Sequence, residues 1–219
     1  MLKISTITEG IVRTSDFAVQ GLQDNVLNLS AYAKSIQKEV SEKTMKDVQV
    51  STIVVALSRI QKRLKKEPRF LPRIEVENIA IKPGLVEMVF ARNPHSIKAL
   101  QKLYRNNKLL AEHLTVTYGI NEISIIILKK RQSEILKIFA PLKPTLEIQN
   151  IASIALRVNP KYTYTKNTFY ALLKILAPRG INVIELLTTS TEISFLVEEK
   201  DWEKTFSIFN ELFKNSLEV

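Results

Sequence analysis

The segment NEISIII at residues 121–127 is answered seventy positions later by TEISFLV at residues 191–197. The similarity continues at the same offset, since IF at 138–139 is matched by IF at 208–209. Self-similarity at a fixed period indicates that one structural unit is used twice. The last two thirds of the chain are therefore predicted to form a duplicated module, and the first third is a separate structure.

The composition is that of a folded chain with one or two domains. With 219 residues, 45% of them hydrophobic, the chain can bury real cores. It contains no cysteine, so disulfides and thiolate metal sites are excluded, which suits a reducing compartment. No apolar run approaches the roughly 18 residues needed to cross a bilayer, and residues 1–10 lack the pattern of a secretory signal. We expect a soluble cytoplasmic protein that does not bind membranes.

The formal net charge of +10 is unevenly distributed along the chain. Residues 1–73 hold 13 Lys and Arg against 7 Asp and Glu, whereas residues 74–219 hold 19 against 15. A concentrated positive field favours polyanionic partners such as DNA. A basic surface that serves solubility alone explains the same asymmetry, so both interpretations stay open.

Residues 15–66 have the pattern of three short helices. Ser15 is the predicted N-cap of a first helix that buries Phe17 and Leu22. The sequence Asn-Leu-Ser at residues 28–30 then interrupts the pattern, and a second helix follows it. Prolines at positions 68 and 72 end the third helix and begin a linker.

The third helix is amphipathic and its outer face is basic. Ser51 and Thr52 are its predicted caps, and an apolar stripe with spacings of four, three and four residues consists of Ile53, Leu57, Ile60 and Leu64. The candidate nucleic-acid-binding residues are Arg59, Lys62, Arg63, Lys65 and Lys66. Three helices with a basic last one are the arrangement of a helix-turn-helix DNA binder. Lys and Arg also decorate the solvated face of any helix, and a platform for packing against the duplicated module is a further alternative.

Residues 74–219 alternate strand and helix signals. Pro83-Gly84 predicts a turn between two strands, and the Gly-containing interruption within residues 114–128 predicts a hairpin. Each repeat runs β-α-β-β-α over about 65 residues, one strand short of the ferredoxin-like pattern. We therefore predict an α+β chain in which an all-helical, helix-turn-helix-like domain over residues 1–73 precedes two ferredoxin-like βαββαβ units, over 74–144 and 145–219.

The second repeat contains the most specific motif. LAPRGINVIE at residues 176–185 is followed by TSTEISFLV at residues 189–197. These residues resemble an ACT domain, and in particular the regulatory ACT pair at the C-terminus of aspartate kinases. The first repeat resembles it more weakly, through YGINEIS at residues 118–124. The resemblance implies two βαββαβ ACT units, a homodimer formed through them, and an amino-acid effector held at an interface between ACT units.

The resemblance also places the effector site. In that family the ligand loop lies between the first strand and the first helix, and backbone groups of the Gly-Ile-Asn segment help to hold the ligand. A helix N-terminus offers N–H groups and a positive dipole end that suit a carboxylate. The candidate effector-binding residues are Thr163, Lys166, Asn167, Thr168, Ile181, Asn182, Val183, Ser190 and Glu192. Ser190 and Glu192 have the alternative role of shaping the turn.

The candidate ligand loop departs from the family pattern. The family commonly has a Gly at the start of the first helix, which allows close backbone approach, whereas residues 165–169 read TKNTF. Bulkier side chains in this loop would block an effector site. A purely structural dimerisation module is therefore the alternative to a ligand-binding one.

Catalytic groups are sparse. The 73 residues before the repeats are too few for an aspartate kinase catalytic domain, and the five glycines form no phosphate-binding loop. His95 and His113 are far apart in sequence, and no metal-ligand pattern surrounds them. We expect a non-enzymatic regulator without cofactor or metal, which senses an amino acid and has the basic helices as its output, on DNA. The alternatives are a regulatory subunit for a separate biosynthetic enzyme and a structural relic without a ligand.

Overall fold

The computed structural model describes residues 3–214 and the side chains of residues 3–211, so the last residues of the predicted second unit, 215–219, lie outside the described part. The chain forms two compact units. One consists of residues 1–73 together with 164–171, and the other of residues 74–163 and 172–219. Each unit is described by itself below.

Residues 3–73 form four helices, one more than predicted. Their bounds are α1 Ile4–Arg13, α2 Asp16–Gln23, α3 Leu29–Thr44 and α4 Val50–Leu64. The missed helix, α1, contributes Ile11 and Val12 to the core. The predicted cap at Ser15 is confirmed, whereas the interruption predicted at residues 28–30 ends at Asn28, since α3 already begins at Leu29. Ser15 caps α2 by accepting a hydrogen bond from the Ala18 N–H at 3.2 Å, and Asn28 caps α3 in the same way.

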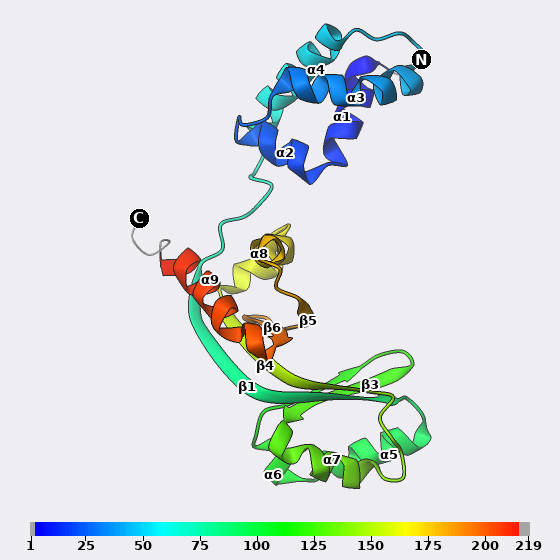
Figure 1. Cartoon of the computed structure of the whole chain (residues 1–219), viewed down its shortest axis with the longest axis vertical. Helices are drawn as coiled ribbons and strands as arrows, with labels where there is room; N and C mark the ends of the chain where they lie inside the picture. The colour runs from blue at the N-terminus through cyan, green and yellow to red at the C-terminus, as the bar shows by residue number, and fades with distance from the viewer. Residues whose placement is uncertain (1–2, 215–219) are drawn as a thin grey trace. The chain divides into compact units, whose positions relative to one another are not determined.

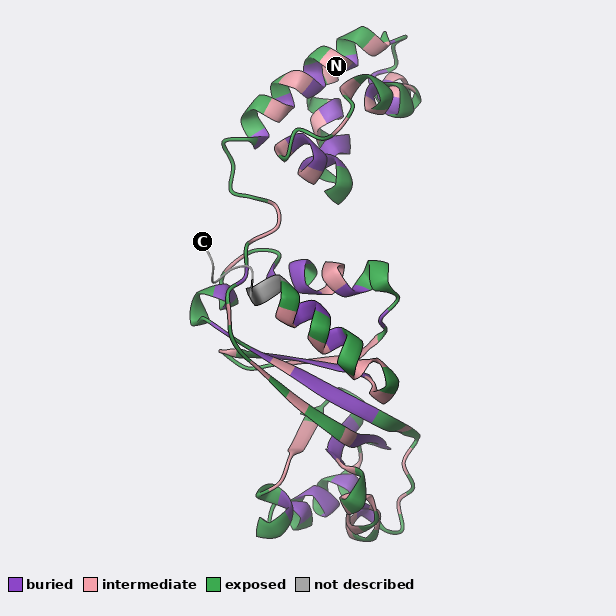
Figure 2. Ribbon diagram, turned by 60° about the vertical axis from the view of Figure 1, so that its left-hand side comes forward, coloured by how far each residue is buried: buried purple, intermediate pink, exposed green. Residues whose placement is uncertain are grey.

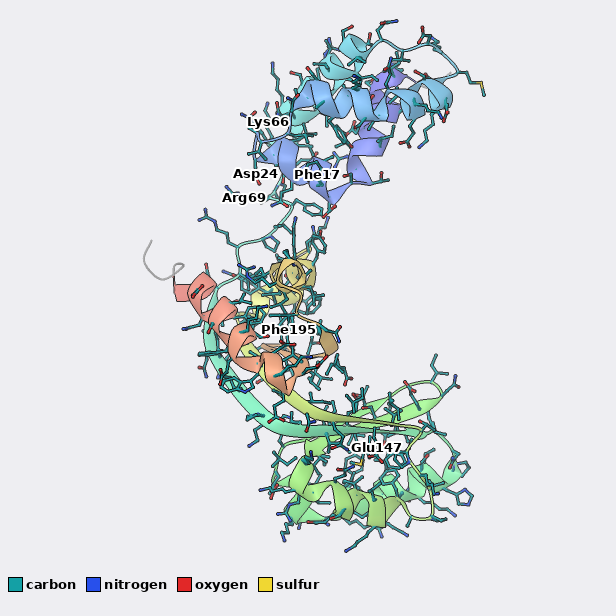
Figure 3. The ribbon with its side chains drawn as sticks, in the orientation of Figure 1. Phe17, Asp24, Lys66, Arg69, Glu147 and Phe195 are labelled. Atoms are coloured by element: carbon teal, nitrogen blue, oxygen red, sulfur yellow. The ribbon has the colours of Figure 1, made fainter. Side chains whose placement is uncertain are left out.

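Two details of the helical prediction are wrong. Phe17 lies on the surface, 65% exposed, because α2 turns Ala18, Val19 and Leu22 toward the core instead (Phe17 is labelled in Figure 3). The predicted capping pair at 51 and 52 lies inside the helix, since α4 already begins at Val50 and its N-cap, Gln49, makes no side-chain capping bond. The predicted apolar stripe of α4 is confirmed, and its four residues are all buried.

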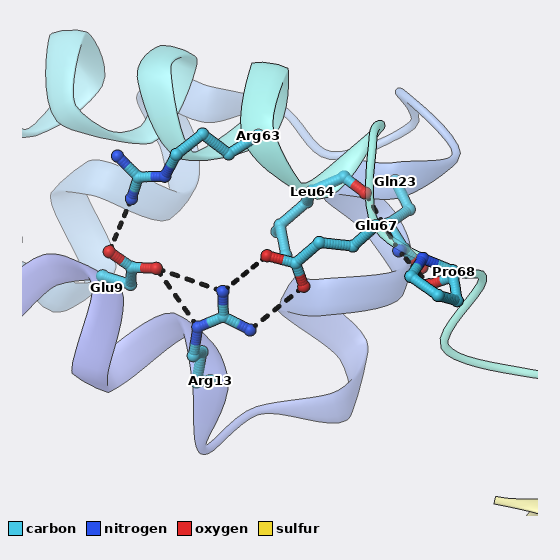
Figure 4. A network of polar contacts seen from close by, with 7 residues as sticks. All are labelled: Glu9, Arg13, Gln23, Arg63, Leu64, Glu67 and Pro68. Atoms are coloured by element: carbon cyan, nitrogen blue, oxygen red, sulfur yellow. Dashed lines mark hydrogen bonds and ion pairs between the residues drawn. The ribbon is translucent and has the colours of Figure 1, made fainter. Parts of the chain in front are cut away.

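A chain of ion pairs joins α1 to the end of α4 (Figure 4). Arg13 lies between two carboxylates, with Nη2 at 2.8 Å from Glu67 and 3.1 Å from Glu9. Glu9 in turn accepts from Arg63 at 2.5 Å. The Arg13 guanidinium holds the pKa of Glu67 below its usual value. A network of charges contributes more to stability than isolated surface ion pairs do. These four residues therefore stabilise the packing of α1 against α4.

The second unit is built on one antiparallel six-stranded sheet (Figure 1). The strands are β1 Val76–Ala91, β2 Leu114–Tyr118, β3 Glu122–Leu128, β4 Leu146–Val158, β5 Val183–Thr188 and β6 Glu192–Glu198. Their order is β2-β3-β1-β4-β6-β5. The two repeats thus contribute β2-β3-β1 and β4-β6-β5, and they join along the long strands β1 and β4, where Ile81 lies opposite Ile154.

The turn predicted at Pro83-Gly84 is wrong. Strand β1 continues through this point, and the pairing with β4 resumes after a register shift between Lys82 and Leu85. Gly84 has a φ of +72°, a conformation that favours glycine and fits the irregularity. The β4 partners on both sides of the shift keep the two halves of β1 in one strand.

The predicted βαββαβ order is also wrong, because within the described residues each repeat ends as βαββα. In a ferredoxin-like unit the last strand pairs with the free edge of the first strand. Here β1 of the first repeat and β4 of the second occupy that edge for each other. The pairing between repeats takes the place of the two missing strands.

Helices cover the outer face of each half of the sheet. Their bounds are α5 Pro94–Leu103, α6 Asn107–Leu110, α7 Gln132–Phe139, α8 Thr168–Leu176 and α9 Trp202–Lys214, with short 3-10 turns η1 Lys129–Arg131, η2 Pro160–Thr163, η3 Ala177–Arg179 and η4 Glu199–Asp201. Phe90 of β1 stacks on Phe139 of α7 at 4.2 Å between ring centroids, and Phe195 of β6 packs on Phe209 of α9 at 5.1 Å (Phe195 is labelled in Figure 3).

The opposite, inner face of the sheet is also buried. Leu85, Ile126, Ile151 and Leu196 form a separate apolar cluster on this face and have no exposed surface. The sheet curls (Figure 2), and further apolar side chains pack against these residues, namely Leu128, Ile148, Ile184 and Leu187. The inner face is therefore a second layer of core, and its polar side chains lie in a partly desolvated space.

Replacing Phe195 with Ala should destabilise the sheet unit by about 3–5 kcal/mol, because Phe195 is completely buried against Phe209. Urea unfolding followed by fluorescence of the single tryptophan, Trp202, measures this unit. Ile120, which is 89% exposed, supplies the control, and Ile120→Ala should leave the midpoint nearly unchanged. Equal effects of the two substitutions would contradict the assigned core.

Candidate functional site

The predicted effector residues of the second repeat lie at both ends of β5. Asn182 and Val183 stand at its start, whereas Ser190 follows its end, about 20 Å away for a six-residue strand. Thr163 lies with Ser190, since its hydroxyl donates to the Ser190 carbonyl at 3.3 Å. Glu192 begins β6 on the same side. The structure thus brings Thr163 and Ser190 together and separates them from Asn182.

The remaining predicted effector residues have other surroundings. Lys166 and Asn167 are exposed, and Asn167 has a left-handed backbone with φ of +64° just before α8. Thr168 is buried, and its hydroxyl donates to the Thr165 carbonyl at 2.9 Å. The Ile181 side chain is buried, so it contributes to packing.

A cavity of about 660 Å³ opens beside Asn182 and Val183, at the start of β5. Its apolar wall is formed by Ile148, Val183 and Ile184, and its polar groups are Gln149, Asn150, Asn182, Glu198, Glu199 and Lys200. Three amides, two carboxylates and one ammonium provide hydrogen-bonding partners of both charge signs. Such a lining suits a small zwitterion, whose carboxylate and ammonium need opposite partners.

Polar contacts within the protein hold several of the side chains that line this cavity. The Lys200 ammonium lies 2.5 Å from the Glu198 carboxylate, and the pairing raises the pKa of Lys200. Asn150 has a left-handed backbone with φ of +57°, and its side-chain oxygen accepts from Lys129 at 3.1 Å. An approaching amino acid would find an ammonium, amide groups and a second carboxylate, Glu199, within one cavity.

Sequence reasoning identified two of the residues around this cavity and missed the others. Residues 148–150 belong to β4, and residues 198–200 lie at the end of β6 and in the turn η4 that follows it. Neither segment resembles a motif. They meet Asn182 because β6 pairs with both β4 and β5, with Ile151 opposite Glu198 and Val183 opposite Val197. The three segments come together only through the order of the strands in the sheet, which no local sequence pattern indicates.

An acidic pair lies on the inner face of the curled sheet. Glu87 of β1 is buried and accepts a 2.5 Å hydrogen bond from the Ser124 hydroxyl. Glu185 of β5 lines the same cavity of about 330 Å³, and its Oε2 atom is covered without a hydrogen-bond partner. Burial, reinforced by the Glu87 charge, raises the pKa of Glu185 to about 7.

The raised pKa predicts how the stability of the sheet unit depends on pH. The folded state keeps the Glu185 proton up to about pH 7, whereas the unfolded chain releases it near the ordinary value of 4.5. Stability should therefore fall as pH rises from about 4.5 to about 7. Glu185→Gln cannot ionise and should remove this part of the decline, so that urea midpoints of variant and wild type diverge as pH rises. The exposed Glu203 provides the control Glu203→Gln, and parallel profiles for wild type and Glu185→Gln would refute the assignment.

The five predicted nucleic-acid contacts do not share one environment. Arg63 is engaged by Glu9, and Lys65 donates to the Asn25 side chain at 3.3 Å. Arg59, Lys62 and Lys66 are exposed and make no ion pair within the described residues (Lys66 is labelled in Figure 3). Arg59 also lines a groove of about 350 Å³ between α1 and α4, whose other residues are Ile4, Ser5, Ser51, Thr52, Val55 and Ala56.

Comparison with solved structures relates the fold to one group of proteins. The regulatory subunit of aspartate kinase from Thermus flavus matches with a TM-score of 0.53 and 14% identity, over 64% of this chain and 99% of that one. The ligand-free regulatory subunit from Thermus thermophilus gives 0.51 and 15%, over 63% and 98%. Clostridium acetobutylicum aspartate kinase gives 0.52 and 16%, over 65% and 36%.

About two thirds of the chain has the fold of the aspartate kinase regulatory region. The resemblance inferred from residues 176–197 is thereby confirmed at the level of fold, and no kinase domain is present among the described residues. No protein-family model matches the sequence, and a search of curated proteins finds no match.

Two further features bear on function. In the described part of the chain, no helix has the length and apolar character that a membrane crossing requires. Residues 3–214 also bring together no group of three His, Asp or Glu side chains that could hold a metal ion.

Proposed function

We propose that this protein is a non-catalytic regulator whose paired ACT-like repeats bind an amino-acid effector. The observation that supports this most is the match to aspartate kinase regulatory subunits over 98–99% of their length. Those chains are named as regulatory subunits. Proteins of similar fold to the sheet unit therefore have a regulatory role. The proposal extends that role to this chain.

The cavity beside Asn182 is the proposed effector site. A free amino acid would place its carboxylate toward Lys200 and the side-chain amides, and its ammonium toward Glu198 and Glu199. The apolar wall of Ile148 and Ile184 would contact the effector side chain. Binding in this way recognises the α-amino and carboxyl groups together, which separates amino acids from simple amines or acids.

Effector binding would act by shifting a population of conformations. A ligand favours the state that it binds more tightly, by its difference in affinity between the two states. We propose that the ACT-like repeats also form the homodimer, and that the basic helical unit delivers the output to DNA. Regulation of a separate amino-acid biosynthetic enzyme through the same helices is the second candidate, favoured by the regulatory-subunit similarity.

A thermal-shift screen over the common amino acids tests the effector proposal. At a hundredfold excess over Kd, a true effector should stabilise the sheet unit by about 2.7 kcal/mol. Asn182→Ala should remove most of that stabilisation, whereas Asn78→Ala, at an exposed position on β1, should leave it intact. The proposal fails if no amino acid shifts the transition, or if Asn182→Ala keeps the full response.

DNA output is tested by the binding of duplex DNA measured at increasing salt. Replacing Arg59, Lys62 and Lys66 with Ala should weaken binding and lower the slope of the salt dependence by about one for each phosphate that is no longer neutralised. These three residues are chosen because their removal breaks no ion pair within the described residues. The control removes three exposed lysines of the same unit that likewise make no ion pair within the described residues: Lys3, Lys34 and Lys46. Equal weakening in both variants, or no binding at low salt, would reject DNA and favour a protein partner.

A further inference from the structure

The inner face of the curled sheet is acidic and rich in hydroxyl groups, although the whole chain carries a net charge of +10. Two cavities lie on this face, of about 300 and 330 Å³, and Thr117 lines both. Neither is lined by Lys or Arg. The side chains on which the argument rests are Glu87, Thr117, Ser153, Glu185, Glu192 and Ser194.

Two buried polar groups on this face lack partners within the protein. Ser153 is only 4% exposed and lines the smaller cavity, yet its hydroxyl makes no hydrogen bond within the described residues. Glu185 Oε2 is covered and equally without a partner. Because Ser153 lines the cavity and has no hydrogen-bond partner within the described residues, its hydroxyl is available to a molecule bound there.

Both repeats contribute to these cavities. Glu87 and Thr117 belong to the first repeat, on β1 and β2, whereas Ser153, Glu185 and Glu192 belong to strands of the second. A molecule bound here would contact the edge strands β2 and β5 as well as the central pair. It would therefore hold the two repeats to each other.

We propose that the inner face binds a small hydroxylated amine, with its ammonium between Glu87 and Glu185 and its hydroxyls against Thr117, Ser153 and Ser194. Carboxylates without neighbouring Lys or Arg in the lining select a cation, and hydroxyl side chains can donate to or accept from a ligand hydroxyl.

Neighbouring groups are compatible with this assignment. His113 lines the smaller cavity, and burial together with the nearby Lys82 charge lowers its pKa, which keeps the imidazole neutral beside a cationic ligand. The effector cavity beside Asn182 shares the apolar Ile148 and Ile184 with the larger inner cavity, but none of the polar groups named above. The inner-face site is thus a second site, and it does not depend on the proposed effector.

Isothermal titration of the full chain in phosphate buffer at pH 7 tests the proposal with glucosamine as the probe. Glucose matches glucosamine in shape without the charge, and putrescine carries ammonium groups without hydroxyls. Glucosamine should bind more tightly than either. Binding of glucose as tight as that of glucosamine, or no heat with any of the three at millimolar concentration, would overturn the proposal.

Variants locate the site. Ser153→Ala should weaken glucosamine binding about five- to tenfold, as expected for the loss of one hydrogen bond, and Glu185→Gln should weaken it at least as much. Asn182→Ala should leave glucosamine binding unchanged, so failure of this proposal and failure of the effector proposal are separate results. Trp202 fluorescence verifies that each variant is folded. Unchanged affinity in both Ser153→Ala and Glu185→Gln would place the amine elsewhere and refute the site.

Discussion

The antiparallel pairing of β1 with β4 is the contact on which the rest of the sheet unit depends. It joins two copies of a β-α-β-β-α unit at the edges where each would otherwise add a last strand. The pairing continues on both sides of the register shift at Gly84, and it places one apolar cluster across both repeats on the inner face. The two repeats are consequently one folded body, and both proposed sites are formed by strands that this pairing aligns.

The sequence predicted local structure well at several positions that carry a short-range signal. The hairpin around Gly119 and the cap at Ser15 both match the structure, because turn chemistry and capping act over a few residues. Pro83-Gly84 has the same local signal as a turn. There the long-range pairing with β4 is stronger, and the residues form an irregular strand.

The candidate site was predictable only in part. Asn182 and Val183 were found from the Gly-Ile-Asn motif, whereas Asn150, Glu198 and Lys200 have no such motif and join them only through the strand order. The acidic inner face could not be predicted either, because its residues also come together only through the arrangement of the strands. Glu87 and Glu185 are almost a hundred residues apart, and only the curl of the sheet brings both to one cavity, where burial raises the pKa of Glu185.

Hydrogen exchange measured with and without a bound amino acid tests the coupling of the two repeats most directly. The amino acid giving the largest thermal shift would be used at saturation. If the β1–β4 pairing transmits binding, protection should rise in peptides covering both 76–91 and 146–158, although the effector cavity lies wholly in the second repeat. Protection confined to residues 148–150 and 182–200, with β1 unaffected, would contradict the account.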